Sequence, residues 1–286
     1  MLLNQTSPSG LGLAWASDLN STLILAWQGS SGNNEINVMF TDGALTKTGA
    51  AFQLPGESTS DTPSVCYIGG APRLFVAWKG STNQNLTVAE LTIVPAADAT
   101  SLPSISGVKN AVVIPGATSD FAPSIAANGG AIILAFTGVG NLQLNYWTLG
   151  LDLVVQSSKQ VGAETSSSAP AIMTDFGPYI AWVGTGNSSL NVVNLSNGQK
   201  DTFQQAGSAP SLANFQGAVF VAWRGIGNSD ISILKQADWL TGANKIVLNG
   251  ATNVTPALVG NNIANHLILG YAGIDANQTL NLVNAI

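Results

Sequence analysis

Short apolar runs of strand length recur along the chain, separated by segments rich in Gly, Asn, Ser and Pro. Residues 23–27, 74–78 and 219–223 are apolar at every position, which is typical of a strand that is covered on both faces. No stretch shows convincingly the 3.6-residue period of an amphipathic helix. The pattern therefore predicts an all-β protein built from many short strands.

Six of the apolar runs end in the same way, and this ending defines a repeat. An aromatic residue is followed two positions later by Gly, and the residue before it is Ala in five copies and Gly270 in the sixth. An Asn comes three or four positions after that Gly. The aromatics, which we call the repeat aromatics, are Trp27, Trp78, Phe136, Trp182, Trp223 and Tyr271, and the repeat asparagines are Asn33, Asn83, Asn141, Asn187, Asn228 and Asn277.

The spacing of the repeat indicates the architecture. A period of about 40 to 60 residues suits a four-stranded propeller blade and is too long for most helical repeats. Each copy opens with a hydroxyl residue or Ala before Pro, from Ser7 and Pro8 in the first copy to Thr255 and Pro256 in the last. We therefore predict a six-bladed β-propeller of four-stranded antiparallel blades as a single domain over residues 1–286, with approximate blade bounds of 7–60, 61–120, 121–167, 168–207, 208–253, and 254–286 plus 1–6.

The two ends of the chain complement each other. The sixth copy reaches Ile286 just after its third strand, so it lacks a fourth. Residues 1–5 form a spare strand before the first copy, in the place that residues 202–205 occupy before a later one. We expect the N-terminal strand to complete the last blade and close the ring, because closure pairs backbone groups that an open edge would leave exposed.

Composition narrows the function classes. Charged residues make up 8% of the chain, against about 25% in typical soluble domains, and the net charge is −6. The nine cationic residues are scattered, so we expect no nucleic-acid partner. The apolar runs are far shorter than a membrane span of about 20 residues, so we expect no membrane insertion. The N-terminus shows no classical signal peptide, which favours a cytoplasmic location or release by a non-classical route.

One face of the predicted propeller gathers the repeated polar residues. The loop leading into each inner strand and the loop after each repeat aromatic lie on that face. Rings, amides and carboxylates together suit sugars, whose C–H faces lie on rings and whose hydroxyls pair with amides and carboxylates. The predicted ligand-binding residues are Trp27, Trp78, Trp182, Trp223, Tyr271, all six repeat asparagines, Asp61 and Asp120.

The same residues have a structural interpretation. A Trp that closes an apolar strand often packs between blades, and Gly followed by Asn is common turn chemistry because both tolerate positive φ. Exposed Trp rings would favour sugar binding. Buried rings would favour a protein-interaction or structural propeller, such as an attachment subunit of a larger assembly.

Catalytic residues are hard to find in the sequence. Glycoside hydrolysis needs two carboxylates at a defined separation, and the fifteen acidic residues are dispersed. The chain has one histidine, His266, and one cysteine, Cys66, which gives little support to a metal site or a catalytic triad. We expect no enzyme activity, no metal and no cofactor. The alternative is a glycoside hydrolase with one axial acidic site around Asp61 and Asp120.

The chain resembles the tandem-repeat six-bladed propeller lectins, such as the fucose-binding fungal and bacterial lectins. The resemblance lies in six copies, an aromatic late in the second strand, and repeated polar loops on one face. Each pocket of that group uses an Arg and a Glu with an aromatic, whereas the residues after the aromatic are here Gln28, Lys79, Thr137, Val183, Arg224 and Ala272. The resemblance implies glycan or glycoconjugate partners. The expected function is non-catalytic, multivalent carbohydrate binding through shallow sites on one face.

Overall fold

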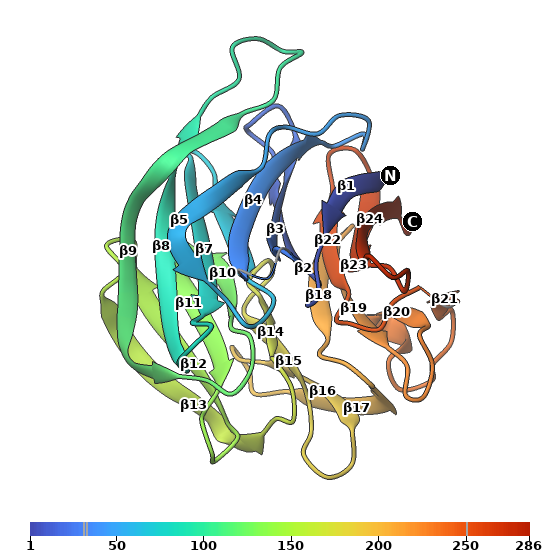
Figure 1. The fold of residues 1–286 in the computed structure, drawn as a ribbon. Helices are drawn as coiled ribbons and strands as arrows, with labels where there is room; N and C mark the ends of the chain where they lie inside the picture. Colours follow the sequence, from blue (N-terminus) through green and yellow to red (C-terminus); the bar gives the residue numbers. More distant parts are fainter. Residues whose placement is uncertain (31, 33, 250) are drawn as a thin grey trace.

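The computed structural model describes residues 1–30, 32, 34–249 and 251–286. Six four-stranded antiparallel sheets stand in a ring around a central axis (Figure 1). The predicted fold class, a six-bladed β-propeller, is confirmed. The described residues include one short 3-10 helix, η1 (Gln236–Asp238), and none of their helices is long and apolar enough to cross a membrane.

Each blade runs outward from an inner strand beside the axis. Blades one to three comprise β2 (Leu11–Ala16), β3 (Thr22–Gln28), β4 (Glu35–Asp42) and β5 (Phe52–Ser58); β6 (Ser64–Ile68), β7 (Arg73–Lys79), β8 (Asn85–Val94) and β9 (Ser104–Thr118); and β10 (Ser124–Asn128), β11 (Ala131–Thr137), β12 (Gln143–Gly150) and β13 (Val155–Thr165). Blades four and five comprise β14 (Ala171–Met173), β15 (Tyr179–Val183), β16 (Ser189–Asn194) and β17 (Lys200–Gln205); and β18 (Ser211–Phe215), β19 (Ala218–Arg224), β20 (Ile231–Lys235) and β21 (Ile246–Leu248).

The sixth blade is shared between the two ends of the chain. Its first three strands are β22 (Ala257–Asn261), β23 (His266–Ala272) and β24 (Thr279–Asn284), and its outer strand is β1 (Leu2–Thr6). β1 pairs antiparallel with β24, and both termini lie together at this blade (Figure 1). The Leu3 side chain is 1% exposed in the core between blades six and one. The predicted closure of the ring by the N-terminal strand is confirmed.

The apolar core is divided into six clusters, one at each junction of neighbouring blades. This division explains the second strands, which are apolar at successive positions. Each second strand faces a blade on both sides, so alternate residues enter different clusters: Leu25 packs between blades six and one, whereas Ile24 packs between blades one and two. The ring is therefore held together mainly by packing between blades.

The strand registers align the six inner strands. In each blade, the residue just before the repeat aromatic on the second strand pairs with one residue of the inner strand. These inner-strand residues are Gly12, Ser64, Ser124, Ala171, Ser211 and Ala257. A proline precedes this position in five blades, but in the first blade the preceding residue is Leu11. Pro8 is therefore not the counterpart of the other prolines. Ser7 instead matches buried hydroxyl residues that lie three positions further upstream in four of the other copies, Thr59, Ser119, Ser166 and Thr252.

An ion pair ties the second blade to the third. The Arg73 guanidinium donates to both carboxylate oxygens of Glu90, at 2.8 and 2.7 Å, and also to the Leu151 carbonyl of blade three at 2.7 Å. Lys109 Nζ lies 3.1 Å from Glu90 Oε1. The Glu90 side chain is 7% exposed, and its hydrogen bonds from Arg73 lower its pKa below the ordinary value despite this burial.

This pair makes a pH-dependent contribution to stability. A carboxyl whose pKa is lowered by folding stabilises the protein above its ordinary pKa of 4.5, and that contribution is lost as the pH falls through the folded value. We expect Glu90→Gln to lower the melting temperature at pH 7 and the difference from the native protein to shrink towards pH 3. Melting curves at several pH values test this. Glu57→Gln is the control, because burial raises the pKa of Glu57 and its effect should have the opposite sign.

Candidate functional site

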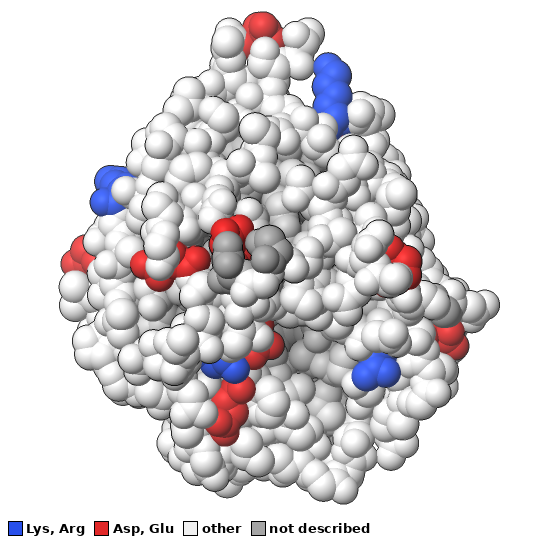
Figure 2. All heavy atoms as spheres, in the orientation of Figure 1, with Lys and Arg blue, Asp and Glu red and all other residues white. Residues whose placement is uncertain are grey.

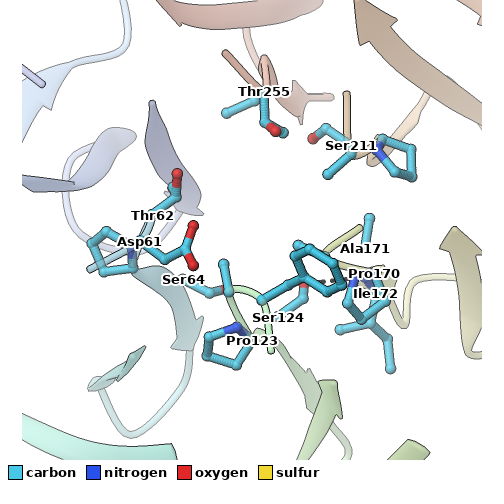
Figure 3. A pocket seen from close by; sticks show the side chains of 18 of the residues that line it. Asp61, Thr62, Ser64, Pro123, Ser124, Pro170, Ala171, Ile172, Ser211 and Thr255 are labelled. Atoms are coloured by element: carbon cyan, nitrogen blue, oxygen red, sulfur yellow. Dashed lines mark hydrogen bonds between the residues drawn. The ribbon is translucent and has the colours of Figure 1, made fainter. Parts of the chain in front are cut away.

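The axis of the ring opens on the face where the inner strands begin. We call this cavity of about 270 Å³ the amino-end funnel. Its wall, part of which Figure 3 shows, combines apolar and polar side chains from all six blades. Those used below are Asp61, Thr62, Ser64, Phe121, Ser124, Ser211 and Thr255, together with the prolines Pro63, Pro123, Pro170, Pro210 and Pro256.

Three serines of the wall join neighbouring inner strands. Ser64 Oγ accepts from the Ile125 amide at 3.0 Å, and Ser124 and Ser211 accept in the same way from the next blade at 3.1 and 2.8 Å. None of the three hydroxyls donates a hydrogen bond within the described part of the chain. Each serine therefore has a proton that it can donate to a molecule in the cavity.

Asp61 is the acidic residue of the wall, and its carboxylate extends into the cavity (Figure 3). Asp61 Oδ2 lies 2.8 Å from Lys79 Nζ, which also donates to the Asp120 carbonyl at 2.9 Å. Asp120 itself lies outside the funnel, where its carboxylate accepts from Gln84 Nε2 at 2.9 Å and from the Gly140 amide at 3.0 Å. The two predicted acidic residues are therefore linked through Lys79 but do not face each other across one cavity.

A ring of aliphatic side chains interrupts the channel below the funnel. We call it the collar, and it consists of Leu13, Val65, Ile125, Ile172, Leu212 and Leu258, one from each inner strand. These residues line both the amino-end funnel and a second cavity of about 210 Å³ at the opposite face. The collar therefore divides the axis into two separate cavities.

Four of the predicted ligand-binding aromatics are buried between blades. Trp27, Trp78, Trp182 and Trp223 are 1%, 1%, 0% and 2% exposed. Each packs in a cluster with a residue from the outer strand of the preceding blade: Leu3, Leu54, Val161 and Phe203 in the same order. Their ring faces are closed to a ligand in this structure.

Tyr271 differs from the other repeat aromatics because its ring is partly exposed. The outer strand of the preceding blade, β21, is the shortest of the six outer strands and ends at Leu248. Tyr271 therefore borders an open groove between blades five and six, which we call the 5/6 groove, with Leu2, Leu248, Asp275, Thr279 and Asn281. The corresponding 1/2 groove is bordered by Leu54, Pro55, Glu57, Trp78, Val108 and Ala111.

The repeat asparagines shape the hairpins after the second strands. The side-chain oxygens of Asn83, Asn141, Asn187 and Asn228 accept from the amide two residues further on, at 2.9 to 3.2 Å. A Cβ on the repeat glycine before each would lie 2.4 to 3.0 Å from that oxygen, which explains why glycine recurs. In the sixth copy Asp275 takes this role and Asn277 is exposed. Asn33 lies outside the described residues.

Two repeated features escaped the sequence analysis. Ser7, Thr59, Ser119, Ser166 and Thr252 are all fully buried, and each hydroxyl accepts from the amide two residues later in the connection between blades. The residues after four repeat aromatics donate to carbonyls of these connections: Gln28 to Thr59, Lys79 to Asp120, Thr137 to Ser168 and Arg224 to Gly207. The available signal was a hydroxyl residue four or five positions before five of the six inner strands; the fifth copy has Ala206 there. Within the described residues no three His, Cys, Asp or Glu side chains cluster as metal ligands.

No protein-family model matches the sequence. No curated protein is similar to it in sequence. Solved structures share the fold: an aldose sugar dehydrogenase from Streptomyces coelicolor at 12% identity, over 99% of this chain and 96% of that one, with a TM-score of 0.59. A gluconolactonase from Xanthomonas campestris is 11% identical over 99% of this chain and 88% of that one, at a TM-score of 0.57. A luciferin-regenerating enzyme is 11% identical over 98% of this chain and 91% of that one, at a TM-score of 0.59.

The expectation that the protein is not an enzyme is overturned by these neighbours, which are propeller enzymes. The likeness shows the fold alone, and this fold serves catalysis as well as binding. Dispersion of acidic residues along the sequence was an insufficient ground for excluding an enzyme. In a propeller the residues around one cavity come from all blades, so they are dispersed in sequence even where they meet in space.

Proposed function

We propose that the protein binds carbohydrate in the grooves between blades, with Tyr271 as the main aromatic contact. The observation that carries this proposal is the partly exposed Tyr271 ring, since the other repeat aromatics are at most 3% exposed. A ring with one accessible face offers a sugar the apolar surface on which its C–H groups pack.

The polar groups of the 5/6 groove complement the ring. Burial raises the pKa of Tyr271, so its phenol keeps its proton and can donate to a sugar oxygen. Asn281 Nδ2 donates to the Thr279 carbonyl at 2.8 Å, which fixes the amide with its oxygen available as an acceptor. Asp275 accepts from the Thr279 amide and hydroxyl at 2.9 and 2.7 Å, so the polar wall is ordered before a ligand arrives.

The 1/2 groove supports a second, unequal site. It has the same position relative to its blades, with Leu54 in the place of Leu248 and Trp78 in the place of Tyr271. Trp78 is 1% exposed, so Pro55 and Val108 supply the accessible apolar surface, while Glu57 adds a carboxylate that can accept from sugar hydroxyls. Two weak sites on one rigid ring favour binding to a surface that carries many glycans.

A glycan array with the labelled protein, followed by titration of each hit, tests this proposal. We expect Tyr271→Leu, which keeps an apolar side chain in the blade junction but removes the ring, to weaken sugar binding about tenfold or more. Tyr271→Phe should cost only a few-fold, because it removes the hydroxyl alone. Phe176→Ala is the control, since this ring is 72% exposed and lies away from the groove.

The glycan array also distinguishes carbohydrate binding from a competing function. The burial of four Trp rings favours a propeller that binds a protein partner instead. Absence of any glycan hit, with no sugar raising the melting temperature, would reject carbohydrate binding in the grooves. Equal losses for Tyr271→Leu and Phe176→Ala would reject Tyr271 as the contact.

A further inference from the structure

The amino-end funnel contains a carboxylate oxygen without a partner at its wall. Asp61 Oδ2 pairs with Lys79, which holds the carboxylate in one orientation. Asp61 Oδ1 has no hydrogen bond within the described residues, the side chain is 33% exposed, and it points into the cavity (Figure 3). A fixed carboxylate with one free oxygen is a partner for a cationic donor, because charge-assisted hydrogen bonds are about twice as strong as neutral ones.

The rest of the wall offers hydroxyl protons and apolar surface. Ser64, Ser124 and Ser211 each have a proton to donate, and the Thr255 hydroxyl also points towards the cavity (Figure 3). Phe121 and five prolines supply the apolar part of the wall. Among the described lining residues there is no Lys or Arg. The cavity therefore complements a small molecule that has hydroxyl groups, a short apolar part and no negative charge.

The face around the amino-end funnel carries a net negative charge, like Asp61 in its wall. Seven of the fifteen acidic residues but two of the nine basic residues lie in its loops and strand ends, so five of the six net negative charges are on this face. Charged side chains are sparse and separated on the mostly neutral surface of Figure 2. Both basic residues, Lys79 and Arg224, already donate to backbone carbonyls. A cationic ligand is attracted to such a face and an anionic one is repelled.

We propose that the amino-end funnel binds a small hydroxylated amine, such as an amino sugar. Its ammonium group would bind Asp61 Oδ1 and its hydroxyls would accept from Ser64, Ser124 and Ser211. This site is separate from the grooves between blades, and it does not depend on sugar binding there. A cavity of about 270 Å³ accommodates a single small ring or a comparable chain.

Calorimetric titration with D-glucosamine, D-glucose and D-glucuronate at low salt tests the proposal, because the three differ mainly in charge. With the amine protonated, we expect glucosamine to bind about tenfold more tightly than glucose, and glucuronate to bind more weakly than both. Asp61→Asn, which keeps the shape of the side chain, should abolish the preference for glucosamine. Lys79→Gln should strengthen glucosamine binding several-fold, because it leaves both oxygens of Asp61 to the ligand.

Melting curves of the two variants establish that each is folded. Glucuronate binding as tightly as glucosamine would overturn the proposal, as would an unchanged preference in Asp61→Asn. Loss of glucosamine binding in Tyr271→Leu with full retention in Asp61→Asn would place the ligand in the 5/6 groove and also overturn it. Failure of the glycan array leaves this titration unaffected, so the two proposals fail separately.

Discussion

Deletion of residues 1–6 is expected to lower the melting temperature by about 10 °C or more, or to prevent folding. The deletion removes β1, exposes the edge of β24 and opens the core between blades six and one. Point variants test the contribution of β1 one residue at a time. Leu3→Ala should cost about 2 to 5 kcal/mol of unfolding free energy, because Leu3 is 1% exposed, whereas Leu2→Ala should change it by at most about 0.5 kcal/mol, because Leu2 is 68% exposed.

Chemical denaturation of the three variants and the native protein gives these values. The two leucines are neighbours on opposite faces of one strand, so they differ in burial but share their backbone setting. Similar small effects at both positions, or a truncated protein that melts at the native temperature, would show that β1 does not close the ring.

Trp223→Ala is expected to cost about 3 to 5 kcal/mol of unfolding free energy. Trp223 is 2% exposed, and its ring lies 6.4 Å from that of Phe203, which stacks in turn on Trp239 at 5.1 Å. The truncation leaves a cavity at the junction of blades four and five, and a closed ring has little freedom to collapse around it.

Phe176→Ala is the matched truncation, because it removes an aromatic ring that is 72% exposed. We expect it to change stability by at most about 0.5 kcal/mol. Denaturant titrations followed by tryptophan fluorescence and by circular dichroism measure both variants. A cost below about 1 kcal/mol for Trp223→Ala would mean that the ring is not an essential part of this junction.

The architecture could be predicted because it depends on features that every blade must share. Each second strand lies between two blades and is therefore largely apolar, and four of the following hairpins use the same glycine and asparagine. The predicted alignment of the first copy was wrong by three positions, because Ser7 and Pro8 resemble the opening of the other copies. Only the strand register shows that Leu11 takes that place.

The burial of the repeat aromatics could not be predicted from the repeat itself. What covers Trp78 is Leu54, and what covers Trp223 is Phe203, and both come from outer strands of the preceding blade. These strands vary in length and sequence more than the others, so the repeat gives no register for them. Tyr271 is partly exposed because β21 is short, and no sequence motif predicted the length of that strand.

The axial site was predicted in part. Asp61 was expected on the face where the amino-end funnel opens, and it does line that cavity. The wall serines were missed because the equivalent positions in the other blades are Gly12, Ala171 and Ala257, so the hydroxyl does not recur in every copy. A site at the axis needs one contribution from each blade, and repetition does not identify such a set.

Because of the collar, the axis of the molecule holds two cavities that are each closed at one end, instead of a continuous tunnel. Five of its six side chains are at most 7% exposed, so they leave no open bore between the two faces. A ligand must leave the amino-end funnel by the opening through which it entered. Any large partner that covers that opening would therefore trap a bound molecule and slow its escape, while the cavity on the opposite face would continue to exchange freely with solvent.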